Sequence, residues 1–175
     1  MKAGRDKRVA LARSALLVGA AIACGAGDAA AQHDSSRGAV PFTRLRDAPS
    51  AFTSYSGLAD SALVVVRDSS AWQDLWQRVN RPFIPAPPAP AVDFQQEMIV
   101  VAALGTRPTA GHDVVIEGAQ QDSAGIEILV RRSEPAPGCP VAAAVTRPVD
   151  FARMRADRRA VRFRERQVVV PCSRP

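Results

Sequence analysis

The side chains that could carry chemistry in this chain are few and widely separated. Its histidines and cysteines are His33, His112, Cys24, Cys139 and Cys172. A thiol beside an imidazole is a common nucleophile, so Cys139 with His112 is the pair to consider. Cys139 stands between Gly138 and Pro140, with no sign of the helix N-terminus that would lower the pKa of its thiol. The pattern therefore does not favour a thiol enzyme.

The sequence also lacks the patterns of the common catalytic and metal sites. A zinc site needs three or four Cys, His or carboxylate ligands at characteristic spacing, and no such cluster occurs. There is no Gly-x-Ser-x-Gly elbow, phosphate-binding loop or dinucleotide fingerprint. We therefore predict no catalytic residue, no metal and no cofactor, and a protein that is not an enzyme.

Residues 1–31 have the organisation of a secretory signal peptide. Basic residues through Arg13 precede an apolar stretch that is too short to span a bilayer. Ala29-Ala30-Ala31 fits cleavage before Gln32, whereas Ala21-Ile22-Ala23-Cys24 loosely resembles a lipobox and would make Cys24 a lipidation site. We favour cleavage before Gln32. The protein is then exported, periplasmic or secreted, with a lipid anchor at Cys24 as the alternative.

Export decides how the two remaining cysteines are interpreted. In an oxidising compartment a leftover pair usually forms a disulfide. We predict a Cys139–Cys172 disulfide, which ties a Pro/Gly-rich loop to the segment 168–171.

The basic character of the chain is modest once the leader is set aside. Five of the 23 Lys/Arg residues and two of the 17 Asp/Glu residues fall within residues 1–31, which leaves 18 basic and 15 acidic residues. All 18 are Arg, which a GC-rich genome explains as well as a binding preference does. We predict no nucleic-acid partner, and membrane contact only through a lipid at Cys24.

After the leader, residues 32–50 are polar and without periodicity, and we expect a flexible segment before a domain at 51–175. Within the domain, Leu63–Val66 is a β-branched run typical of a strand. Trp72, Leu75, Trp76 and Val79 follow at the spacing of one helix face. Such a stripe usually packs on a sheet. Asp68, Ser69 and Ser70 offer N-cap side chains at the start of that helix, and Ser70 with Gln73 would make a capping box. The proline-rich stretch 81–91 then ends the helix and serves as a stiff connector.

The stretch 105–113 lies between two predicted strands. Met98–Ala103 reads as a strand with both faces buried, and Val114 and Ile116 alternate with Val115 and Glu117, as in a strand with one drier face. The intervening segment holds two Gly and one Pro, which fix sharp backbone geometry. It is either a plain turn or a recognition loop.

Further strands follow toward the C-terminus. We expect Phe151–Arg155 and Val161–Arg166 to form a hairpin, with Arg162, Arg164 and Arg166 on its exposed side. Eight Arg and three acidic residues lie between Arg147 and Arg166. That stripe is either a solvated face or a surface for an acidic partner. Runs of strands without alternating helices predict an α+β domain, a mostly antiparallel sheet of five to seven strands with one packed amphipathic helix.

Four short motifs in the same order resemble the PrcB C-terminal domain family. They are Trp72 to Trp76, Asp93-Phe94 with Met98–Val101, Leu104 to Ile116, and Pro137-Gly138-Cys139 with Thr146-Arg147-Pro148. The resemblance covers residues 52–168. This chain departs from the family pattern at the tip of the third motif, where Ala110 replaces Gly and His112 replaces Tyr. The family is named for a protein that stabilises a bacterial surface protease complex, so the resemblance implies a non-enzymatic, β-rich interaction module.

We therefore expect an exported, non-catalytic protein-protein interaction or stability module. Its partner would be another exported or surface protein, with a protease as one candidate. The alternative is a protease inhibitor that presents the 105–113 loop. The candidate contact residues are Arg107, Pro108, Thr109, Gly111 and His112, together with the Pro135–Cys139 loop if the fold brings the two loops together. The face formed by Arg162, Arg164 and Arg166 is the other candidate.

Overall fold

A computed structural model of this chain describes residues 37–45 and 54–172. The predicted signal peptide, Cys24 and His33 lie outside those residues. In chain order the described elements are β1 (Gly38–Ala39), β2 (Phe42–Arg44), β3 (Ser61–Val66), α2 (Ser69–Val79), β4 (Glu97–Leu104), β5 (Asp113–Asp122), β6 (Gly125–Pro135), β7 (Val149–Arg155) and β8 (Val161–Val170). No helix among these elements is long and apolar enough to cross a membrane.

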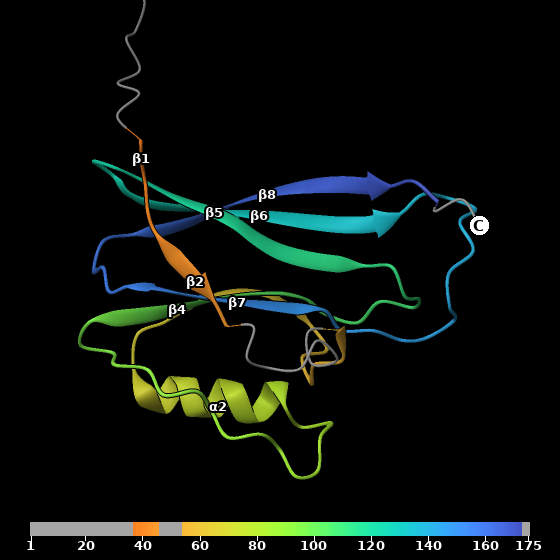
Figure 1. Cartoon of the computed structure of the whole chain (residues 1–175), viewed down its shortest axis with the longest axis horizontal. Coiled ribbons are helices and arrows are strands. Elements are labelled where there is room, and N and C mark those ends of the chain that lie inside the picture. The colour runs from red at the N-terminus through yellow and green to blue at the C-terminus, as the bar shows by residue number, and fades with distance from the viewer. Residues whose placement is uncertain (1–36, 46–53, 173–175) are drawn as a thin grey trace, which may run out of the picture. The chain divides into compact units, whose positions relative to one another are not determined.

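The strands form two four-stranded sheets stacked face to face, and the helix covers the outer face of one of them (Figure 1). Sheet A has the order β1-β5-β6-β8 and sheet B the order β2-β7-β4-β3. Every strand pair is antiparallel except β6–β8. The α+β class with mostly antiparallel strands is therefore confirmed, but the described strands form two sheets instead of one sheet of five to seven strands.

Strand β4 contributes to two cores, because both of its faces are apolar and buried. Val100 and Ala102 face the core between the two sheets, while Ile99 and Val101 face the helix, and all four are completely buried. Full burial of a side chain of this size contributes about 1.5–3 kcal/mol. The predicted strand with two buried faces is thus confirmed.

Helix α2 packs its predicted apolar stripe on sheet B. Trp72, Leu75, Trp76 and Val79 are all buried there, and the two indole rings lie 5.2 Å apart between centroids. Asp68 caps the helix by accepting a hydrogen bond from the backbone N–H of Ala71 at 2.8 Å. The predicted capping box is therefore replaced by an aspartate cap, which lies one residue before the first helical position.

The proline-rich connector is held to the helix by the tryptophans. The indole N–H of Trp72 donates to the carbonyl of Pro90 at 3.0 Å, and that of Trp76 donates to the carbonyl of Pro87 at 2.8 Å. A buried indole needs such an acceptor, and a proline segment leaves its carbonyls free because it forms no internal hydrogen bonds. The stripe is thus both core and anchor for the connector.

Residues 37–45, expected to be part of a flexible leader, belong to the fold. Strand β1 pairs with β5 in sheet A, and β2 pairs with β7 in sheet B. Phe42 packs on the core between the sheets and Leu45 on the core beneath the helix. The expected domain boundary at residue 51 is therefore wrong for these residues. Strands of two and three residues are too short to produce a periodic signal.

The expected hairpin of Phe151–Arg155 with Val161–Arg166 is also wrong. Strand β7 lies in sheet B, whereas β8 crosses to sheet A and pairs in parallel with β6 along its whole length. Two neighbouring strands with a polar turn between them usually pair. Here the turn at residues 156–160 carries the chain from one layer to the other.

Candidate functional site

The predicted contact loop lies against a second loop that is distant in the sequence. Residues 105–112 connect β4 to β5, and residues 136–148 connect β6 to β7. The backbone of Arg107 and that of Thr146 exchange two hydrogen bonds, of 2.8 and 3.0 Å. Ala110 donates its N–H to the carbonyl of Ala142 at 3.0 Å. Two of the motifs noted in the sequence are therefore hydrogen-bonded to each other.

Gly105 lets the first loop turn immediately after β4. Its φ is 71°, and a Cβ there would lie 2.6 Å from the backbone N of Ser61 and 2.7 Å from the carbonyl of Ala59. No other residue fits such a site without displacing backbone. Thr106 then donates both its N–H and its hydroxyl to that same carbonyl of Ala59. The start of the loop is thereby fixed against the segment before β3.

Thr146 fixes the tip of the first loop from the other side. It is 5% exposed, and its hydroxyl donates to the carbonyl of Thr109 at 3.1 Å. The next residue, Arg147, exchanges backbone hydrogen bonds with Ser54 and Ser56. Residues 142–148 therefore lie between the contact loop and the segment that precedes β3. The contact loop therefore has a structural role in the fold and is also a candidate binding surface.

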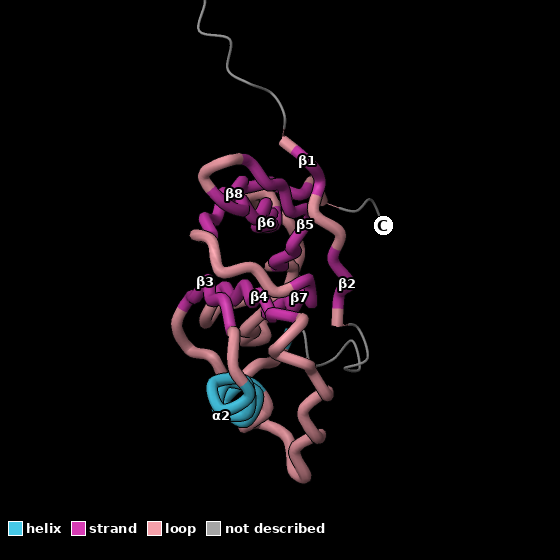
Figure 2. The backbone as a smooth tube through the Cα atoms, turned by 90° about the vertical axis from the view of Figure 1, so that its left-hand side faces the viewer, coloured by secondary structure: helices cyan, strands magenta, loops and turns pink. Residues whose placement is uncertain are grey.

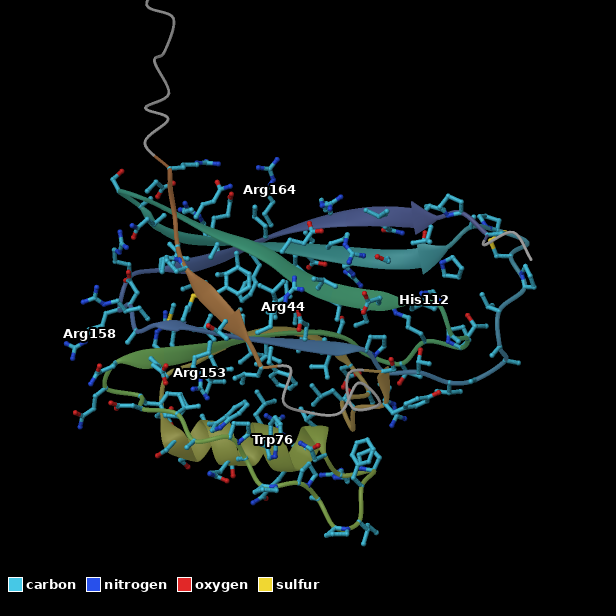
Figure 3. All side chains as sticks on the ribbon, viewed as in Figure 1. Arg44, Trp76, His112, Arg153, Arg158 and Arg164 are labelled. Atoms are coloured by element: carbon cyan, nitrogen blue, oxygen red, sulfur yellow. A yellow bond between two sulfur atoms is a disulfide. The ribbon has the colours of Figure 1, made fainter. Side chains whose placement is uncertain are left out.

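Arg107 and His112 line the same hollow in the surface. The Arg107 guanidinium donates to the carbonyl of Leu104 at 3.0 Å. It lines a hollow of about 160 Å³ together with His112, Arg132 and Glu134. The imidazole of His112, which follows Gly111, is partly exposed. Figure 3 places His112 at the start of β5.

The hollow sets the charge state of His112. Burial lowers the pKa of its imidazole below the ordinary value of 6.5, and the positive charge of Arg107 lowers it further. The carboxylate of Glu134 acts in the opposite direction. The imidazole is therefore neutral at pH 7 and offers one donor and one acceptor.

The exposed part of the two loops is apolar and rigid. The residues there with exposed side chains include Pro108, Pro140, Val141 and Val145, and Val145 is 58% exposed. We call the exposed surface of loops 105–112 and 136–148 the contact face. A Cβ on Gly111 would lie 3.4 Å from Val141 and 3.5 Å from Pro135, so the fold does bring the two predicted loops together. Sequence reasoning missed Val141 and Val145 because exposure in a loop has no periodic signal.

A disulfide holds the second loop. Cys139 and Cys172 are bonded, with their Cα atoms 5.1 Å apart, as predicted. Beside it, Ala136 donates its N–H to the carbonyl of Val170 at 2.9 Å. The loop is thereby fastened to the end of β8, next to the exposed Val169 and Val170.

The arginine face lies on the outer surface of sheet A and is partly neutralised. Arg166 donates two hydrogen bonds of 2.7 Å to Glu117, which also accepts one of 2.9 Å from Arg131. Donation from Arg166 is the main reason that the pKa of Glu117 lies below its ordinary value. Arg162 lies 3.5 Å from Asp122. Arg164 has no such partner among the described residues and points away from β8 (Figure 3).

In the part of the chain that the structure describes, no group of three His, Cys, Asp or Glu side chains is placed to hold a metal ion. Residues 98–155 contain both loops at this end of the β-sandwich, and the two loops are hydrogen-bonded to each other. Residues 98–155 match the PrcB C-terminal family. The resemblance seen in the motifs is therefore confirmed for β4 through β7.

The PrcB C-terminal match contains the whole contact face. Loops 105–112 and 136–148 both fall within it, whereas α2, β3 and β8 lie outside. A search of curated proteins and a search of solved structures found no match. The family match therefore concerns the central strands and the contact face, while the helix and the last strand are described by the structure alone.

Proposed function

We propose that this chain is an exported, non-catalytic binding module that supports a protein complex through the contact face. The observation that carries the proposal is a preordered apolar surface on two interlocked loops. Association must offset about 0.5–1.5 kcal/mol for each flexible side chain that it immobilises. Pro108 and Val145 present few rotamers, and the backbone beneath them is hydrogen-bonded at Arg107 and Ala110. Binding to this face therefore needs little further ordering.

The PrcB C-terminal match supports the same proposal, because it contains both loops. A protease complex is the partner class that the family resemblance favours. The N-terminal pattern of residues 1–31 supports export, and the sequence lacks the patterns of the common catalytic sites.

The contact face favours a support module over a protease inhibitor. A loop that enters a protease cleft needs free backbone groups and an extended, projecting shape. The N–H groups of Arg107 and Ala110 already donate to Thr146 and Ala142. These backbone N–H groups are therefore already used within the domain, whereas an inhibitor loop would need them free to bind the protease.

Co-purification from the native envelope extract tests the proposal. We expect a stoichiometric partner to be retained by the natural chain and lost by Val145→Asp, since a charge at the face removes apolar contact. Ile84→Asp is the matched control, because Ile84 is an apolar residue that is 97% exposed on the proline-rich connector. Loss of the partner with both variants, or with neither, contradicts the proposed face. Inhibition of a protease panel by the pure chain would support the inhibitor instead.

A further inference from the structure

The two sides of the sandwich are closed differently. On one side, residues 37–45 pass from sheet A to sheet B and pair with a strand of each. On the opposite side, β8 ends sheet A and β3 ends sheet B, and no further strand pairs with either one in the described residues. Figure 2 shows β3 and β8 together on one side and β2 on the other. We call the space between β3 and β8 the seam.

The seam is hollowed along its length. A cavity of about 230 Å³ is lined by Leu63 of β3 and by Arg132 and Glu165 of sheet A. The hollow of His112 adjoins it and shares Arg132 with it. A third hollow, of about 450 Å³, lies toward the other end of the same strands, between Val65 and Val161. Both sheets therefore contribute walls to the seam.

Apolar side chains line the seam without being fully covered. Leu63 and Val65 of β3 and Val161 and Phe163 of β8 pack on the core between the sheets, yet each is only partly buried. Covering their remaining apolar surface is favourable by about 25 cal/mol for each Å² removed from water. An added strand along β8 would cover part of it.

Strand β8 is built to accept such a strand. All ten of its residues are paired with β6 on one edge, while its other edge has no backbone partner among the described residues. Exposed strands of this length are usually shortened or covered, because they template pairing with another chain. The hydrogen bond from Ala136 to Val170 and the disulfide at Cys172 hold the end of β8 in place. The free edge is therefore preordered.

The charge of the side chains around the free edge of β8 favours one kind of added strand over another. Arg162, Arg164 and Arg166 are exposed on the outer face of β8. Arg162 and Arg166 have acidic neighbours, Asp122 and Glu117, whereas Arg164 has none among the described residues. Arg67 and Arg158 line the hollow at one end of the seam. Glu165 is the one acidic residue of the strand, and it is paired with Arg132 at 2.6 Å. A second copy of β8 would set the same arginines against each other, which is unfavourable. An acidic strand would meet opposite charges.

We propose that the free edge of β8 binds an extended acidic segment of a partner protein as an added strand. Main-chain hydrogen bonds along the edge would supply affinity, and Arg164 with its neighbours would select the sign of charge. This surface is distinct from the contact face.

A synthetic peptide of alternating Glu and Val, matched in length to β8, tests the proposal. We expect it to bind the purified chain with an affinity that falls as salt is added. The matched peptide of alternating Lys and Val should not bind. In amide hydrogen exchange, every second amide of residues 161–170 should become protected, because successive backbone N–H groups of a strand point to opposite edges. The others already point toward β6.

Two charge reversals complete the test. Arg164→Glu should weaken binding of the acidic peptide by about three- to tenfold, since it replaces an exposed attraction by a repulsion. Arg78→Glu, an equally exposed change on helix α2, should leave binding unaltered, as should Val145→Asp on the contact face. Binding of both peptides alike, no binding, protection outside β8, or self-association of the free chain through β8 would each overturn the proposal.

Discussion

Replacing Asp150 by alanine should weaken the joint between the two sheets. Asp150 lies on β7 in sheet B, and its carboxylate accepts the backbone N–H of Ile116 in sheet A at 2.8 Å. Ile116 lies at a β-bulge, where the ladder leaves its backbone groups free for other partners. Its carbonyl accepts from the guanidinium of Arg44 at 2.6 Å. One residue of sheet A is thus held by two charged side chains of sheet B.

The magnitude follows from what each group loses. Ile116 is completely buried, so leaving its N–H without a partner costs about 1–3 kcal/mol. The Arg44 guanidinium lies 3.7 Å from the Asp150 carboxylate with 24% of its side chain exposed, which adds up to about 1 kcal/mol. Removing a buried carboxylate offsets part of this, because burial also raises the pKa of Asp150. We expect a net loss of about 2–3 kcal/mol in the free energy of unfolding.

Urea denaturation of the natural chain and of Asp150→Ala measures this loss. Asp150→Asn keeps one acceptor oxygen and should lose less, and Asp60→Ala, an exposed aspartate, should change stability by less than about 0.5 kcal/mol. Arg44→Ala combined with Asp150→Ala should lose less than the two single losses together, because the residues share Ile116. A loss below about 0.5 kcal/mol for Asp150→Ala would refute the role assigned to this joint.

Three further outcomes are expected. Trp76→Ala should lower the free energy of unfolding by about 3–5 kcal/mol, as a buried large-to-small change; a loss under about 1 kcal/mol in urea denaturation would show that this face is not core. Gly105→Ala should lower the free energy of unfolding by more than about 2 kcal/mol, because of backbone strain and overlap with neighbouring backbone atoms. Gly138 has a φ of 80° but nothing within 4 Å of an added Cβ, so Gly138→Ala should lower it by only about 1 kcal/mol in the same assay. The pKa of His112 is lower in the folded chain than in the unfolded chain, so the unfolded imidazole binds a proton at higher pH than the folded one. The contribution of His112 to the free energy of unfolding is therefore complete above pH 6.5 and is lost as the pH falls through the lowered pKa. The natural chain should therefore lose more stability than His112→Gln between about pH 7 and about pH 5, and equal losses would show that His112 is not the group responsible.

Features set by local periodicity were predictable from the sequence. The buried strand before Leu104, the alternation of Val114 with Val115, and the helix stripe around Trp76 each follow from which residues share a face. The disulfide followed from a different argument, which combined the predicted export of the chain with the number of cysteines left. These predictions needed no knowledge of which strand pairs with which.

Strand pairing could not be read from the same patterns. The alternation of Val161 and Phe163 is identical whether β8 pairs with β7 in a hairpin or with β6 in parallel. The choice depends on which layer has space for the strand. Likewise the candidate contact residues Arg107 and His112 line one hollow with Arg132, and the backbone of Arg107 is bonded to that of Thr146. Neither arrangement has a signal in the local sequence. The exposure of Val145 was not predictable either, because exposure in a loop has no periodic signal.

The segment 37–45 has a consequence for how the chain folds. Residue 44 pairs with residue 152, and residue 39 with residue 120, so both sheets are completed by contacts between distant parts of the chain. Contacts of this kind form slowly, because the entropy cost of closing a long loop comes before the free energy gained from the contacts. The β6–β8 pair likewise joins two strands of sheet A across β7, which lies between them in the sequence but in sheet B.

Until those contacts form, β4 is the part of the chain most at risk. Its run from Met98 to Leu104 is uncharged and apolar on both faces, a composition that favours intermolecular strand pairing when exposed. Folding yield should therefore depend on chain concentration during refolding, and more strongly when residues 37–45 are removed. The strand at the centre of the folded core is then also a segment that favours aggregation during folding.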